Sequence, residues 1–119
     1  MATSVGVETK KITGGYTYTL DQAVSQDSSN VNVTLAVRLT NPDGSPKIYW
    51  SMFLQRYTNG VWVTIGTRTG YVSTSSKSDR TFTNVSNNTG KKTRVKTNLY
   101  WDSAHSDYIA AIPGPTWTR

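Results

Sequence analysis

Alternation of apolar and polar residues is the clearest pattern in the chain. From position 31 to 39 every odd residue is valine or leucine, and the residues between them are mostly polar. The segment 93–101 repeats this pattern, with Val95, Leu99 and Trp101 on one side. A period of two indicates a β-strand with one apolar face, and such a face has to pack against a second sheet. The pattern therefore predicts a two-layer all-β domain.

Further strand-like segments are separated by turn signals. We expect one or two strands in 5–20, broken at Gly14-Gly15, and strands at 31–40, 47–57, 61–67, 80–85, 91–101 and 108–112. Polar or Gly-, Pro- and Asn-rich stretches favour loops and turns at 21–30, 41–46, 73–79, 87–90 and 102–107. Asn59-Gly60 favours a two-residue hairpin turn, because both central residues of a type I′ turn have positive φ.

The number and spacing of these strands indicate how they are arranged. About seven short strands with regular turn signals are typical of an immunoglobulin-like Greek-key sandwich. We therefore predict one domain over 1–119, an all-β, two-sheet antiparallel β-sandwich of about seven to eight strands. One sheet would hold 47–57, 61–67, 91–101 and 108–112, and the other the N-terminal strand, 31–40 and 80–85. The predicted core consists of Val33, Leu35, Val37, Trp50, Met52, Leu54, Val95, Leu99 and Trp101.

Composition also favours strands over helices. Thr, Ser and Asn make up about a third of the residues, and Glu8 is the only glutamate, whereas helix surfaces favour Glu, Gln, Lys and Ala. Without cysteine the chain can form neither a disulfide nor a thiolate site. No apolar run reaches membrane-spanning length, and residues 1–10 lack the apolar segment of a signal peptide. The polar surface composition favours a secreted protein, in which case this is the mature form.

Basic residues outnumber acidic ones. Thirteen Lys and Arg against seven Asp and Glu give a net charge of +6, which favours anionic partners through long-range attraction. Cell-wall polymers, acidic glycans and a phospholipid membrane surface fit this charge, whereas nucleic acid is not the partner we expect. The same charge is also compatible with a basic surface that only keeps the protein soluble.

Two motifs carry a family resemblance: Leu54-Gln-Arg-Tyr-Thr-Asn-Gly-Val-Trp-Val-Thr-Ile65 and Gly90-Lys-Lys-Thr-Arg-Val95. Together they resemble small secreted β-sandwich proteins of Gram-positive bacteria, of immunoglobulin or fibronectin-III type. Those proteins have a central hairpin of the form Leu-Gln-Arg, turn, Trp, and a later strand of the form Gly-x-x-Tyr-Arg-Val. Thr93 stands where they have the tyrosine. The resemblance implies export and a sandwich fold, and it implies no reaction.

Candidate catalytic groups are few. The single histidine, His105, lies between Asp102 and Asp107 in a predicted turn that also holds serines. A hydrolase triad is assembled from distant positions on rigid elements, so neighbours in one turn do not supply it. The spacing also matches no known metal loop. We therefore predict a polar hairpin turn, with no enzymatic activity, no metal and no cofactor.

The candidate binding site is a face of one sheet. If 47–57 pairs with 91–101, the outward residues are Tyr49, Phe53 and Tyr57 on one strand and Lys92, Arg94, Lys96 and Tyr100 on the other, with Trp62 beside the hairpin turn. Aromatic rings interleaved with cations offer both stacking surface and charge. The alternative is that Arg94 and Lys96 only lay their stems over Phe53 and Tyr49, which finishes the sheet surface.

Position also separates the tryptophans. Trp50 and Trp101 fall in core register, whereas Trp62 and Trp117 are the better candidates for exposure. Alternatively, Trp117 clamps the C-terminal segment onto the sheet.

These observations leave three functions open. The preferred one is a secreted, non-enzymatic binding module for an anionic extracellular surface, such as a cell-wall polymer or another polysaccharide. The second is a secreted antimicrobial or membrane-active toxin, because basic charge and aromatic residues suit membrane interfaces. The third is a structural or assembly subunit that pairs through exposed edge strands. The ligand and the oligomeric state stay open.

Overall fold

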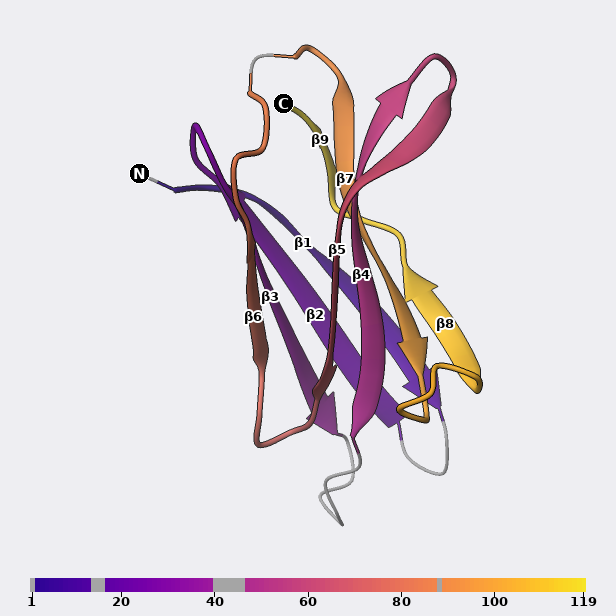
Figure 1. Ribbon diagram of the computed structural model, residues 1–119. Helices are drawn as coiled ribbons and strands as arrows, with labels where there is room; N and C mark the ends of the chain where they lie inside the picture. Colours follow the sequence, from indigo (N-terminus) through magenta and orange to yellow (C-terminus); the bar gives the residue numbers. More distant parts are fainter. Residues whose placement is uncertain (1, 14–16, 40–46, 88) are drawn as a thin grey trace.

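The computed structural model describes residues 2–13, 17–39, 47–87 and 89–119, and within these ranges it consists of strands, turns and loops without a helix. The strands are β1 Thr3–Thr13, β2 Thr17–Gln26, β3 Val31–Leu39, β4 Ile48–Thr58, β5 Val61–Val72, β6 Ser78–Phe82, β7 Lys92–Tyr100, β8 Tyr108–Ile112 and β9 Thr116–Thr118 (Figure 1). The described part of the chain thus offers no long apolar helix for a membrane. The expected interruption at Gly14-Gly15 and the expected turn at 41–46 lie outside the described residues.

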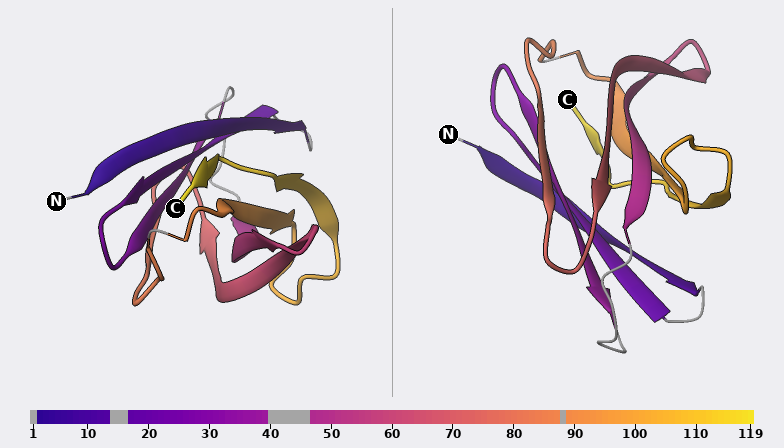
Figure 2. Two further views of the ribbon diagram at one scale, coloured as in Figure 1. Left: turned by 90° about the horizontal axis from the view of Figure 1, so that it is seen from above. Right: turned by 60° about the horizontal axis from the view of Figure 1, so that its bottom comes forward.

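The strands form two antiparallel sheets that face each other. One sheet has the order β1-β2-β3-β6, and the other has the order β5-β4-β7-β8, with β9 also paired to β7. The chain crosses between the sheets after β3, after β5 and after β6, which is the Greek-key connection of an immunoglobulin-like sandwich. Seen from above, β1 to β3 form a layer over the sheet that contains β4, β5, β7 and β8 (Figure 2). The predicted fold class and the predicted partition of the strands are confirmed.

β2 corrects the prediction of a loop at 21–30, because the strand continues to Gln26 and pairs along its length with β1 and β3. Alternation persists through this segment: Gln22 and Val24 are buried like Leu20, but the glutamine conceals the pattern. The Gln22 amide can be buried because its nitrogen and its oxygen both form hydrogen bonds. It donates to the carbonyls of Val95 (3.1 Å) and Gly114 (2.8 Å), and it accepts from the Thr97 hydroxyl. Gln22 therefore ties the two sheets together through the core.

β5 also runs further than predicted, to Val72 instead of residue 67. Gly70 suggests that the strand has ended, but it lies on the inner face of β5 opposite Trp50, as Gly66 lies opposite Leu54. A Cβ at either position would lie 2.7 Å from the ring of a buried aromatic residue, Phe82 at Gly66 and Trp50 at Gly70. The glycines therefore make room for those rings instead of ending the strand. β6 is shifted as well, to Ser78–Phe82 instead of 80–85.

The core lies between the two sheets and contains the predicted residues with one exception. Val33, Leu35, Val37, Trp50, Met52, Leu54, Val95 and Leu99 are buried. Trp101 is the exception, because β7 ends at Tyr100 and Trp101 is only half-buried, packing edge-on against Tyr18 at a centroid distance of 5.7 Å. The reason is that the strand pattern does not continue into the turn.

The C-terminal segment closes one end of the sandwich. Trp117 is not exposed: it packs against the core from β9, and its Nε1 donates to Gln26 Oε1 at 2.8 Å, as the clamping alternative requires. Arg119 is buried beside it, and its guanidinium donates to the carbonyls of Asp27 (2.9 Å) and Val85 (2.9 Å). The strand β9 therefore joins the loops at this end.

The hairpin turn between β4 and β5 has the predicted geometry, with φ of 52° at Asn59 and 82° at Gly60. Replacing Gly60 with Val is expected to cost about 1–2 kcal/mol, because a β-branched residue resists positive φ. Gly60→Asn is the matched control and should cost clearly less, since asparagine tolerates this conformation. Chemical denaturation measures both. Equal losses for the two variants would contradict the turn assignment.

Candidate functional site

The outer face of the sheet β5-β4-β7-β8 brings the predicted site residues together. Across β4 and β7, Phe53 lies opposite Lys96 and Gln55 lies opposite Arg94. Because side chains alternate along a strand, these residues point away from the core formed by Leu54 and Val95. The predicted pairing of the two strands and the predicted outward orientation of these residues are therefore confirmed.

A row of four tyrosines crosses this face, with one residue from each strand. Tyr71 of β5 pairs with Tyr49 of β4, Tyr49 with Tyr100 of β7, and Tyr100 with Tyr108 of β8. The ring centroids are 6.1 Å apart for Tyr49 and Tyr71 and 5.8 Å apart for Tyr100 and Tyr108. We call Tyr71, Tyr49, Tyr100 and Tyr108 the tyrosine row. The outer two are the most open, with 43% of Tyr71 and 56% of Tyr108 exposed.

Nitrogen-bearing side chains flank the tyrosine row. The Lys47 ammonium lies 4.6 Å from the centroid of the Tyr71 ring, within the range of a cation–π contact. The His105 ring stacks on Tyr100 at 4.6 Å with an interplanar angle of 3°. His105 Nδ1 is also 2.9 Å from the hydroxyl oxygen of Ser51, which is buried in the sheet beneath it. His105 is therefore part of the face and not a group on an isolated loop.

The loop 101–107 places His105 by means of the Asp102 carboxylate. This carboxylate accepts hydrogen bonds from the backbone N–H of Ser106 (3.0 Å) and of Asp107 (2.9 Å), and also from the Ser106 hydroxyl. The hydroxyl of Ser106 and the N–H of Asp107 hold the pKa of Asp102 below its ordinary value. The carboxylate is thus engaged within its own turn, and no three His, Cys, Asp or Glu side chains in the described ranges come together as metal ligands.

Arg94 and Trp62 form a packed pair at the other end of the face. The Arg94 guanidinium lies 4.2 Å from the centroid of the Trp62 ring, and its Nε donates to Gln55 Oε1 at 2.8 Å. Tyr57 packs edge-on against the same tryptophan at 5.2 Å. Trp62 is therefore half-buried, which corrects its expected exposure. The shielding alternative holds for Arg94, but the ring that it covers is Trp62 and not Phe53.

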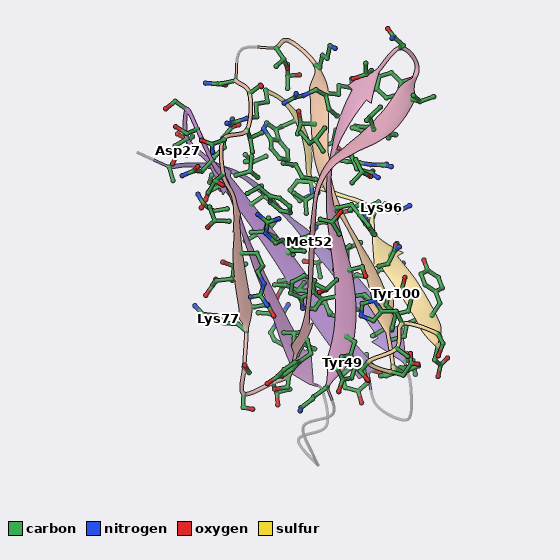
Figure 3. The ribbon with its side chains drawn as sticks, in the orientation of Figure 1. Asp27, Tyr49, Met52, Lys77, Lys96 and Tyr100 are labelled. Atoms are coloured by element: carbon green, nitrogen blue, oxygen red, sulfur yellow. The ribbon has the colours of Figure 1, made fainter. Side chains whose placement is uncertain are left out.

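The two lysines of β7 are less engaged. Lys96 is half-exposed opposite Phe53, and the described residues give its ammonium no hydrogen bond and no ion pair. Lys92 is exposed at the rim, opposite Thr118 of β9. Figure 3 shows Lys96, Tyr100 and Tyr49 following one another along the β4–β7 side of the molecule. Lys96 thus lies on the face between Arg94 and Tyr100, whereas Lys92 lies at the opposite end of β7 from the tyrosine row.

Four contributors to this face were missing from the predicted site: Lys47, Tyr71, His105 and Tyr108. Tyr71 was missed because the predicted strand ended at residue 67, although Tyr71 continues the alternation of Thr67 and Thr69. Tyr108 begins a predicted strand, but its pairing with Tyr100 depends on a register shift between Leu99 and Tyr100. The sequence contains no signal that predicts the stacking of His105 on Tyr100, because the position of His105 depends on the conformation of the loop 101–107.

Comparisons with known proteins add nothing to this geometry. A scan against models of protein families, a search of curated proteins and a search of solved structures each found no match. The resemblance to small secreted sandwich proteins stays a prediction from the sequence.

Proposed function

We propose that the protein is a secreted, non-enzymatic binding module that holds an anionic polysaccharide, such as a cell-wall polymer, against the outer face of the sheet β5-β4-β7-β8. The observation that carries the proposal is the tyrosine row. Tyrosine combines an apolar ring with a polar hydroxyl, so a row of such rings can stack on sugar rings and bond to their hydroxyl groups. A line across four strands suits an extended chain better than a compact ligand.

Charge on the same sheet supports an anionic ligand. The strands β4, β5, β7, β8 and β9 contain no aspartate or glutamate, and β7 carries Lys92, Arg94 and Lys96 on its outer face. Lys96 and Lys92 have no acidic neighbour on these strands that would neutralise them. Charges placed in this way attract carboxylate, sulfate or phosphate groups of a polymer and weaken with salt. The tyrosine row would provide contact area, and the lysines would provide attraction.

Retention on a panel of anionic polymers tests the proposal. Polygalacturonate, hyaluronate and a polyol phosphate are the probes, and dextran is the neutral control. We expect retention on at least one anionic probe at low salt, with the affinity falling as salt rises. The variant Arg94→Ser/Lys96→Ser should bind about tenfold more weakly. Lys10→Ser/Lys11→Ser removes the same charge from β1 of the other sheet and is the matched control. The proposal would be contradicted if the protein were retained on none of the anionic probes, or if both variants lost the same amount of affinity.

One observation favours membrane activity as a second candidate. The tip of the β4–β5 hairpin projects from the body of the sandwich (Figure 1), and it exposes 58% of Val61, 41% of Val63 and 43% of Ile65. Exposed aliphatic residues beside basic ones suit an anionic membrane interface. Leakage of dye from anionic vesicles separates the two functions: a binding module causes none, and a membrane-active protein causes leakage that Val61→Asp abolishes.

A further inference from the structure

The edge strands β5 and β6 approach each other on one side of the sandwich (Figures 1 and 2). A cavity opens there. Its volume is about 210 Å³, and its walls come from β4, β5, the end of β6 and the loop 83–86. The cavity lies at the seam between the sheets, away from the tyrosine row. A ligand in this cavity would therefore be independent of the polysaccharide proposed for the outer face.

Among the described residues that line this cavity, two are arginines and none is acidic. Arg56 donates through Nη2 to the carbonyl of Ser86 at 3.1 Å, and Arg68 donates through Nη2 to the carbonyl of Thr81 at 3.1 Å. Neither arginine forms an ion pair within the described ranges. Both guanidiniums are thus bonded to neutral carbonyl groups, and their charges are uncompensated.

Arg56 leaves one donor without a partner. Its Nε is buried and has no hydrogen bond in the described part of the chain. A buried N–H of this kind costs free energy unless it meets an acceptor. A second cation lies close by, because Arg119 donates through Nε to the same Ser86 carbonyl at 3.2 Å. Two guanidiniums that share one carbonyl repel each other, and the Asp27 carboxylate is the anion that attracts Arg119. An anion in the cavity would attract Arg56 in the same way.

The rest of the lining is mixed. Leu54, Ile65, Phe82 and Val85 contribute carbon atoms, and Thr83, Asn84 and Ser86 are polar. The Phe82 ring is buried between Gly66, which has no side chain, and the Arg68 guanidinium, which lies 4.7 Å from the ring centroid. Ile65 at the rim is the most exposed apolar residue of the lining, with 43% of its surface exposed. The cavity therefore places two guanidiniums beside a lining that is apolar in part.

We propose that this cavity binds a carboxylate carried on a short apolar stem. Arginine presents paired N–H donors that match a carboxylate, and the apolar part of the lining, with Ile65 at the rim, accommodates a short stem. The volume is below the ~300–1,000 Å³ of pockets for drug-sized ligands, so the ligand is a small acid or the end of a chain. A chain with a terminal carboxylate and a free short acid present the same chemistry.

A titration followed by ¹⁵N–¹H NMR tests the proposal, with hexanoate as the probe. We expect saturable shifts at the amides of Asn84, Val85 and Ser86, and at the Nε–H of Arg56. Hexanol has the stem without the charge, and acetate has the charge without the stem, so each should bind about tenfold more weakly than hexanoate. A peptide ending in leucine, with and without C-terminal amidation, distinguishes a chain end from a free acid.

A pair of variants isolates the charge. Ile65 lies at the rim on an exposed edge strand, so Ile65→Asp and Ile65→Asn remove the same apolar contact and should both fold. Only the aspartate competes for the arginines, and it should weaken hexanoate binding about tenfold relative to the asparagine variant. Equal affinities for hexanoate and hexanol, equal affinities of the two variants, or shifts confined to the tyrosine row would each overturn the proposal. An unperturbed Arg56 Nε–H would do the same, because it would mean that the carboxylate does not reach this arginine.

Discussion

Replacing Trp50 with alanine is expected to destabilise the protein by about 3–5 kcal/mol. Trp50 is fully buried and is the largest of the fully buried side chains. Its indole Nε1 donates to the Ser78 hydroxyl at 3.2 Å, and that hydroxyl in turn donates to the carbonyl of Tyr71 at 2.7 Å. The Arg80 guanidinium also lies 5.0 Å from the centroid of its ring. The substitution therefore removes contacts with both sheets and leaves a cavity between them.

Chemical denaturation measures this loss, and Trp50→Phe is the control. Phenylalanine keeps much of the ring volume but loses the hydrogen bond to Ser78, so we expect it to cost well under half as much as alanine. A loss below about 1 kcal/mol for alanine would show that Trp50 is not between the sheets.

Replacing Gly70 with valine should also destabilise the fold, by about 1–3 kcal/mol, through overpacking. A Cβ at this position would lie 2.7 Å from Cζ2 of Trp50 and 2.7 Å from Nη2 of Arg80. The arginine end can move, but the buried indole cannot move without displacing its neighbours. The thermal midpoint and the free energy of unfolding report the effect, and an unchanged stability would contradict the close approach.

The double variant Trp50→Ala/Gly70→Val tests whether a side chain at position 70 occupies the same space as the Trp50 indole. In the absence of the indole, the valine side chain enters vacated space, so the double variant should be more stable than the sum of the two losses predicts. Simple additivity would mean that the residues do not share a space.

The alternation of apolar and polar residues was enough to predict the two-sheet architecture. It failed to predict the extent of a strand where a residue makes its main contacts with other strands. The alternation in β3 and β7 reflects burial of one face, and such periodicity is visible in any single strand. Gln22 and Gly70 look like loop or turn residues, because their roles depend on partners in other strands. Gln22 bonds to the carbonyls of Val95 and Gly114, and Gly70 faces the ring of Trp50.

The outward face of the candidate site was predicted, but its contacts were not. The hydrophobic pattern determines which side chains of β4 and β7 face outward, and it does not determine that Phe53 pairs with Lys96. The tyrosine row needs in addition the full length of β5 and the register shift between β7 and β8, which the pattern does not specify. The contact of Arg94 with Trp62 could not be predicted, because the pattern does not determine which ring a long side chain covers.

The most direct test of the tyrosine row is the affinity of the variant Tyr71→Ala/Tyr108→Ala for the anionic polymer that the wild-type protein binds in the panel above. Both side chains are exposed at the ends of the row, so removing them should leave the thermal midpoint nearly unchanged. Val7→Ala, which trims a side chain that is 59% exposed on the other sheet, is the control. At low salt the tyrosine variant should bind the polymer about tenfold or more weakly than wild type, while the Val7 variant binds as wild type does. Wild-type affinity in the tyrosine variant would contradict the proposed role of this face.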